Sequence, residues 1–226
     1  MKNSIVNNAV KTAVKKSLAV ATLAAPALFA ANVQASGFAY DGIQLSYEKT
    51  SFAASSILQS FDFNTVRVEG MYSISPTIVV GGTFSSGSGD TRGQAQGGGT
   101  IGVDVKGSGP TAFGFYHSEL NDKTDFQIGG AFSMEETEVT AGGRDVPELS
   151  DDDTTKAIIA GLRHQFSPDL ELGVRASYDL DADDDEFSFE AIARYSLEGD
   201  LDVLASFAPD GDGDTITLGI KKYLNF

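Results

Sequence analysis

The stretch "GDTITLGIKKYLNF" at residues 213–226 decides the fold. Counting back from Phe226, every second residue down to Ile216 is apolar except Lys222, and mostly polar residues stand between them. A period of two is typical of a β-strand with one apolar face and one polar face. The stretch alone leaves open whether the apolar face meets a protein core or lipid.

The same period recurs along most of the chain. Beyond the N-terminal region, no stretch longer than a turn or two has helical periodicity, and clusters of Ser, Gly and Asp separate the alternating segments. This pattern is typical of all-β proteins. We predict ten strands, at residues 38–49, 61–74, 78–88, 111–120, 126–138, 155–166, 170–180, 186–197, 201–208 and 214–226.

Residues 1–35 have the three-part organisation of a secretory signal. Four lysines without an acid precede the apolar run "LAVATLAAPALFAA", and a small residue, Ala35, closes the segment. The apolar run is short for a membrane-spanning helix. We therefore predict a cleaved signal peptide at residues 1–35 and a single domain at residues 36–226.

The charge of the chain excludes several classes of function. The 226 residues carry a net charge of −16, and removal of residues 1–35 takes away four lysines and no acid, which leaves −20. Nucleic acid is bound through clustered Lys and Arg, so we predict no nucleic-acid partner. The absence of cysteine from the sequence excludes disulfides, thiolate metal sites and a cysteine nucleophile.

The connections between the predicted strands alternate between short and long. The short ones are "SPT", "SPD", "EGD" and "NDKTD", each with an odd number of residues, so that the flanking apolar residues fall on one face. The others are long or acidic, including the Gly-rich stretch at residues 86–110 and the stretches at 138–153, 181–185 and 209–214. Short turns at one end, long loops at the other and an even strand number are typical of bacterial outer-membrane barrels.

The two faces of the predicted strands differ in chemistry. One face is almost entirely apolar, and the other carries five basic and four acidic residues together with Gly, Ser and Thr. Near-neutrality in so acidic a chain favours a lumen where buried charges must pair, over a water-exposed surface. The charged face comprises Arg67, Glu69, Arg163, Gln165, Glu171, Arg175, Glu190, Arg194, Asp202 and Lys221.

Three motifs resemble the small outer-membrane β-barrel proteins of proteobacteria, the porin-family proteins with OmpA- and PagP-like barrels. They are "FYHSELNDKTDF", "FSPDLELGVRASYD" and "GDTITLGIKKYLNF". The resemblance implies an antiparallel up-and-down transmembrane barrel of ten strands, alternatively eight, in the bacterial outer membrane. It also implies contact with membrane lipids and lipopolysaccharide, and recognition by the barrel-assembly machinery through the C-terminal strand ending in Phe226.

The histidines and acidic loops are the candidate sites for chemistry. His117 and His164 both lie close to short turns, far from the loop end where enzymes of this kind carry their working residues, so we predict structural roles for them. "DLDADDDEFSFE" has the acidic spacing of a calcium loop, but Asp184 replaces the required glycine and Glu190 falls in a predicted strand. We therefore predict no catalytic, cofactor-binding or metal-binding residue. A loose association of divalent cations with the acidic loops stays open.

The sequence thus favours a structural barrel or a narrow, cation-favouring, porin-like channel. The alternative is a binding protein or adhesin that acts through its acidic loops, and an enzyme is the third possibility. We expect the lumen to be largely filled by side chains, because a barrel of about eight strands is just filled by its interior residues and ten strands add little room.

Overall fold

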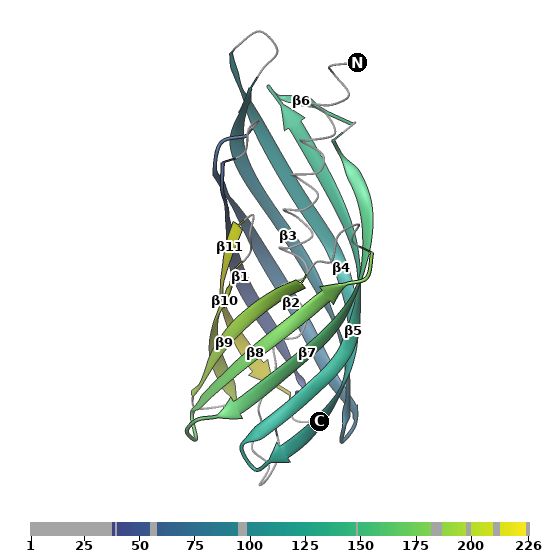
Figure 1. Ribbon diagram of the computed structural model, residues 1–226, viewed down its shortest axis with the longest axis vertical. Helices are drawn as coiled ribbons and strands as arrows, with labels where there is room; N and C mark the ends of the chain where they lie inside the picture. The colour runs from purple at the N-terminus through teal and green to yellow at the C-terminus, as the bar shows by residue number, and fades with distance from the viewer. Residues whose placement is uncertain are drawn as a thin grey trace.

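The protein forms a single antiparallel β-sheet that closes on itself (Figure 1). The computed structural model describes residues 38, 40–54, 58–94, 99–147, 149–181, 187–197, 200–209 and 213–224. The strands are β1 (Gly42–Phe52), β2 (Phe61–Ser75), β3 (Ile78–Gln94), β4 (Thr100–Asn121), β5 (Thr124–Ala141), β6 (Arg144–Asp145), β7 (Asp151–Gln165), β8 (Leu170–Asp179), β9 (Phe187–Leu197), β10 (Leu201–Ala208) and β11 (Gly213–Tyr223). The described residues contain no helix long and apolar enough to cross a membrane.

Ten of these strands make up the barrel, and the two-residue β6 is an appendage of β5. Each barrel strand pairs with its neighbours along the chain, and β1 pairs with β11 from Gly42↔Tyr223 to Phe52↔Gly213, which closes the cylinder. A closed antiparallel barrel leaves no strand edge unpaired. The structure therefore confirms the predicted ten-stranded up-and-down barrel.

The Gly-rich connection was predicted as a loop, and that prediction is wrong for most of its length. β3 continues to Gln94 and β4 begins at Thr100, so both run far beyond the predicted 78–88 and 111–120. The glycines belong to the strand because rings from β2 occupy the space beside them. A Cβ added at Gly87 would lie 2.5 Å from the ring of Phe63. Larger residues there would displace that ring.

A second predicted loop, at residues 138–153, is largely sheet as well. β5 extends to Ala141, and a two-residue turn leads into β6, which pairs back through Ala141↔Arg144. Gly142 and Gly143 have φ values of 59° and 75°. The two-residue hairpin turn that matches the twist of the strands requires positive φ at both of its central residues. Glycine adopts such angles without strain.

The first predicted strand, 38–49, begins too early. β1 starts at Gly42 and extends to Phe52, while the segment before it turns into the barrel and buries Tyr40. The prediction failed because Phe38 and Tyr40 alternate with small residues as residues of a strand do, although they are out of phase with Ile43 and Leu45 and the chain has left the sheet. Phe226, at the other end, lies outside the described residues, as does the predicted signal peptide.

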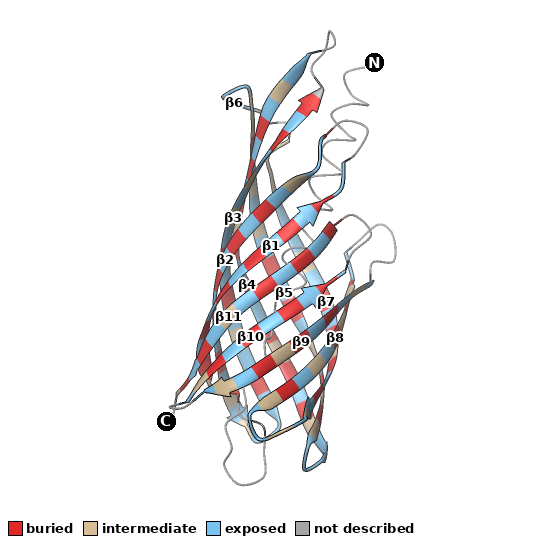
Figure 2. Ribbon diagram, turned by 90° about the vertical axis from the view of Figure 1, so that its left-hand side faces the viewer, coloured by how far each residue is buried: buried red, intermediate tan, exposed pale blue. Residues whose placement is uncertain are grey.

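Burial alternates residue by residue along the strands (Figure 2). The outward residues form an apolar belt of exposed side chains, and this assigns the predicted apolar face to the outside of the barrel. Lys222, the exception in the C-terminal pattern, lies at the short-turn end, 4.0 Å from Asp200. The belt includes Ile43, Leu45, Tyr47, Val66, Val68, Tyr72, Phe84, Tyr116, Ile128, Met134, Ile158, Leu162, Leu172, Val174, Phe189, Tyr195, Phe207, Ile216, Leu218 and Ile220.

Candidate functional site: the interior of the barrel

The predicted charged face points into the barrel. All nine of its ionisable residues are buried, whereas Gln165, close to a short turn, is only half-buried. Three more acids join them, Glu48 on β1, Asp125 on β5 and Asp179 on β8. Each of the three occupies one of the alternate positions of its strand that face inward. Applying the same alternation to β1 and to the ends of the strands would therefore have predicted these acids as interior residues. The fully buried part of the described interior thus holds seven acidic and five basic side chains.

Glu171 is the centre of the charged layer nearest the short turns. It accepts hydrogen bonds from Arg163 Nε at 2.9 Å and Arg163 Nη2 at 2.5 Å, and from Arg194 Nη1 at 2.7 Å. Both arginines are 1% exposed. Arg194 Nε also lies 3.8 Å from Asp202, which accepts a hydrogen bond from Tyr223. One carboxylate therefore holds arginines from β7 and β9 together inside the barrel.

Two further ion pairs lie along the interior. Arg67 Nη1 on β2 is 2.9 Å from Glu48 Oε2 on β1, and both side chains are almost fully buried. Arg175 on β8 pairs with Glu190 on β9, again without exposure to bulk solvent. Both pairs join neighbouring strands. Because a buried charge without a partner is costly, this pairing is what the near-neutral composition of the face predicted.

The segment before β1 fills the short-turn end of the barrel. Tyr40 donates a hydrogen bond to Asp125, and its hydroxyl accepts one from Gln127 Nε2 at 2.7 Å. Its carbonyl oxygen accepts a hydrogen bond of 3.0 Å from Lys221 Nζ. Phe38 lies beneath the guanidinium of Arg163, 4.7 Å from ring centroid to Cζ. These contacts tie the N-terminal segment to β5, β7 and β11.

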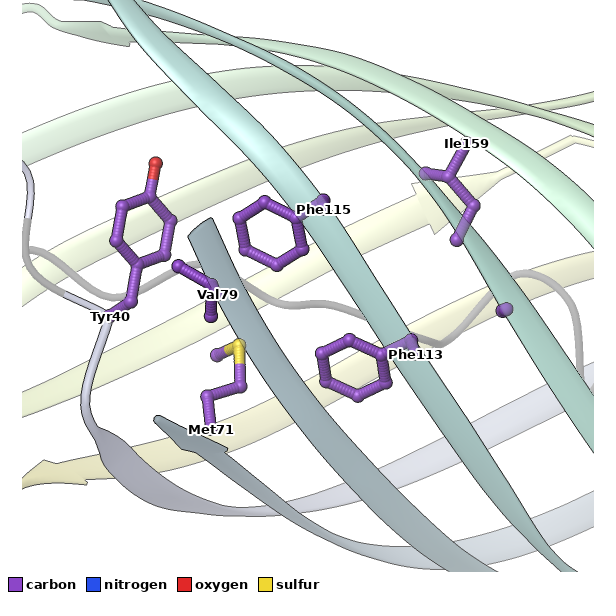
Figure 3. Packing of buried hydrophobic residues seen from close by; sticks show 7 residues of the cluster. Tyr40, Met71, Val79, Phe113, Phe115 and Ile159 are labelled. Carbon is purple, nitrogen blue, oxygen red and sulfur yellow. The ribbon is translucent and has the colours of Figure 1, made fainter. Parts of the chain in front are cut away.

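Apolar side chains from β2, β3, β4, β5 and β7 pack beside this segment (Figure 3). Tyr40 packs edge-on against Phe115, with 5.3 Å between ring centroids, and both belong to a buried cluster. The ring of Phe113 lies against Gly81, and the Cα and Cβ of Phe115 lie against Gly129, so an added Cβ at either glycine would clash. The remaining members of the cluster are Met71, Val79, Ala131 and Ile159.

A second apolar cluster lies at the loop end of the interior. It gathers side chains from β1, β2, β4 and β5 around Leu58, which comes from the connection between β1 and β2 and forms an isolated bridge to Gly93. On β5 and β7, Asp125 and Arg163 lie nearer the short turns than Ala131 and Ile159 of the first cluster, so the charged groups are not confined between the two clusters. The second cluster consists of Phe52, Leu58, Phe63, Val103, Val105 and Val139.

The two histidines lie near the short turns, as predicted, but on opposite faces of the wall. His117 is buried inside, with Nδ1 3.2 Å from Asp125 Oδ1 and its ring 4.5 Å from that of Tyr40. His164 is exposed on the outside, with Nδ1 3.0 Å from Thr124 Oγ1. The structure does not bring them together. The structural role predicted for both histidines stays a prediction.

The acidic stretch "DLDADDDEFSFE" is divided between the two faces of the barrel. Asp181 binds Lys156 Nζ on the outside, at 3.1 Å, while Glu190 pairs with Arg175 inside. Asp183 and Asp184 lie outside the described residues, as do Asp210 and Asp212. Among the residues that the structure describes, no group of three or more His, Asp or Glu is arranged to hold a metal ion.

A closed ten-stranded antiparallel barrel with an apolar outer belt and a paired, charged interior is the architecture of outer-membrane β-barrel proteins. No family model matches the chain. No curated protein sequence is similar to it.

Solved structures nevertheless share the fold. The translocator domain of the autotransporter NalP from Neisseria meningitidis is 11% identical with a TM-score of 0.53, and the alignment covers 98% of both chains. The transport unit of AIDA-I from Escherichia coli is 11% identical with a TM-score of 0.51, covering 92% of this chain and 98% of that one. The β domain of the Bordetella autotransporter Brka is 12% identical with a TM-score of 0.51, covering 81% and 98%. The resemblance inferred from sequence is confirmed as a likeness of fold.

Proposed function

We propose that the protein is an integral outer-membrane barrel whose lumen is closed by its own side chains, and which passes at most small cations. The observation that carries the proposal is the layer around Glu171, where two arginines that are 1% exposed are held by one carboxylate inside the closed wall. Pulling either arginine aside leaves a charge buried without its partner, which is costly. The apolar belt supports the membrane location, because such a surface is unfavourable in water.

The preference for cations follows from the balance of charge. The buried interior holds seven acids and five bases, and the sequence has further acidic stretches, "SDDD" at 150–153, "DADDDE" at 181–186 and "DGDGD" at 210–214. Clustered negative charge raises the local concentration of cations and opposes the entry of anions. Any current through the barrel is therefore expected to be small and carried mainly by cations.

Single-channel recording in a planar bilayer tests this proposal. The unaltered protein is expected to give little or no current, and Arg175→Ala or Arg194→Ala to raise it by removing part of the obstruction. Arg144→Ala is the matched control, because that arginine is exposed on β6. A wide, weakly selective pore in the unaltered protein would overturn the closed-lumen proposal. Recovery of the protein in the soluble periplasmic fraction would overturn the membrane location.

A second candidate function is binding through the loop end. β3, β4 and β5 have 17, 22 and 18 residues, against 8–11 in β8 to β11, and they rise beyond the rest of the barrel (Figure 1). This projecting sheet carries exposed acids, among them Asp90 and Asp104. Cells that display the protein are expected to attach to immobilised polylysine, a cationic probe. Shortening β3 and β4 to the length of β8 should abolish attachment, and unchanged attachment would contradict the binding role.

A further inference from the structure

The outer wall of the barrel is hollowed where β2, β3, β4 and β5 leave the apolar belt. A groove of about 450 Å³ lies there, formed by two rows of side chains that neighbour one another across the strands. Its middle is low, because β3 and β4 contribute glycine and serine except at Lys106. The lower row is Val66, Ser86, Ser108 and Glu136, and the upper row is Asn64, Ser88, Lys106 and Glu138.

The position of the groove relative to the belt is fixed by strand register. The next row towards the short turns contains Val68, Phe84 and Pro110, which pair in that order and are all exposed. Above that row the outward residues become polar within two positions on each strand. The groove therefore begins at the edge of the apolar belt, where acyl chains give way to headgroups in a membrane.

The lining offers hydrogen-bond donors and acceptors that the described protein leaves unused. Lys106, Glu136 and Glu138 are exposed, and none of their side chains forms a hydrogen bond or ion pair with another described residue. The side-chain Oδ1 of Asn64 accepts a hydrogen bond of 2.5 Å from the Tyr47 hydroxyl, which leaves the side-chain Nδ2 to donate. Hydroxyl groups, an amide nitrogen, one ammonium and two carboxylates together match a molecule whose own hydroxyls both donate and accept.

The charges argue for an uncharged polyhydroxylated ligand. Two carboxylates face a single ammonium across the groove, so a phosphate placed there would be repelled more than attracted. A saccharide has no such conflict. Since the lower end of the groove continues into exposed Val66 and Phe84, the ligand that fits both ends is amphiphilic.

We propose that this groove binds the saccharide headgroup of an outer-leaflet glycolipid, whose acyl chains run down the belt over Val68 and Phe84. The proposal rests on the proposed membrane location. It adds a specific lipid site to a surface that would otherwise contact lipids without distinction between headgroups. Lys106 and the carboxylates of Glu136 and Glu138 bind the sugar hydroxyls, and the serines allow the sugar to approach the sheet.

Native mass spectrometry of the folded protein released from detergent micelles tests the site. The probe is a diacyl lipid with an uncharged disaccharide headgroup, compared with a phosphocholine lipid of the same acyl chains and with the free disaccharide. We expect the glycolipid to be retained about tenfold more than the phosphocholine lipid, as the loss of a hydrogen bond to a charged group implies. We expect no retention of the free disaccharide.

Two variants and a control locate the binding. Lys106→Ala removes a donor and Ser108→Phe fills the groove, and each should lower glycolipid retention about tenfold. Thr154→Phe adds the same ring on the outer face of β7, outside the groove, and should have no effect.

Equal retention of the two lipids, or no response to either groove variant, would overturn the proposal. If the free disaccharide were retained as strongly as the glycolipid, the groove would bind the sugar without the acyl chains, and the proposal of a lipid ligand would be wrong. The gel shift between boiled and unboiled samples reports the barrel itself, so a failure of the membrane proposal is seen separately.

Discussion

Replacing Glu171 by glutamine removes the carboxylate from between two buried arginines while keeping the size of the side chain. Glu171 accepts three hydrogen bonds, two from Arg163 and one from Arg194. The amide oxygen of glutamine can still accept from one guanidinium, but its NH2 group then faces the donors of the other. At least one arginine that is 1% exposed therefore loses its charged partner.

The cost follows from the burial of that pair. Removing one partner of a buried ion pair costs about 3–5 kcal/mol, and the single remaining acceptor places Glu171→Gln near the lower figure, at about 3 kcal/mol. An exposed ion pair contributes at most about 1 kcal/mol. The pair of Lys156 and Asp181 has side chains that are 55% and 37% exposed at 3.1 Å, so Asp181→Asn is the matched control.

Urea unfolding of the protein refolded into lipid vesicles measures both variants, with the mobility of unboiled samples on a gel as the readout. Glu171→Gln should lower the free energy of unfolding by about 3 kcal/mol, and Asp181→Asn by less than about 1 kcal/mol. The reasoning is refuted if the two variants lose equal stability, because the interior charges would then be as well solvated as those on the surface.

Three further outcomes are expected. Deleting Phe226 should reduce the amount of folded barrel in the outer membrane, and insertion equal to that of the full chain would show that the terminal aromatic is not needed for assembly. Replacing both His117 and His164 with glutamine should leave any activity intact, whereas a large loss of rate in a folded double variant would favour an enzyme. Tyr40→Ala should raise the single-channel current, because the phenol that fills the short-turn end is gone; a current unchanged from that of the unaltered protein would mean that the apolar cluster around Phe115 closes this end without it.

The barrel could be predicted from the sequence because the two faces of every strand meet different surroundings. A residue that faces lipid must be apolar and one that faces the interior must be paired or small, so Val66 and Arg67 reveal their faces without any alignment. The odd length of the short turns then kept the same face outward from strand to strand. Even Lys222 is consistent with this rule, because it lies at the short-turn end of its strand and close to the carboxylate of Asp200.

The ends of β3 and β4 and the N-terminal segment could not be predicted in this way. Glycine is depleted in strands in general, so residues 86–110 had the composition of a loop. Whether such glycines lie in a strand depends on rings such as Phe63, which come from another strand and fill the space beside them. For Tyr40 the local pattern was correct for a strand, but its hydrogen bonds to Asp125 and Gln127 draw it into the interior.

β1 pairs with β11, which is synthesised last, so the contact that closes the barrel can form only after all the other strands have been made. Gly42 pairs with Tyr223, the most distant partner in sequence anywhere in the described sheet. Contacts of such high sequence separation slow folding, because the intervening chain must be ordered before they form. A nascent or truncated chain that lacks β11 presents two open edges, on β1 and β10, each able to pair with another chain. The barrel therefore depends on protection from aggregation until its final strand has been delivered.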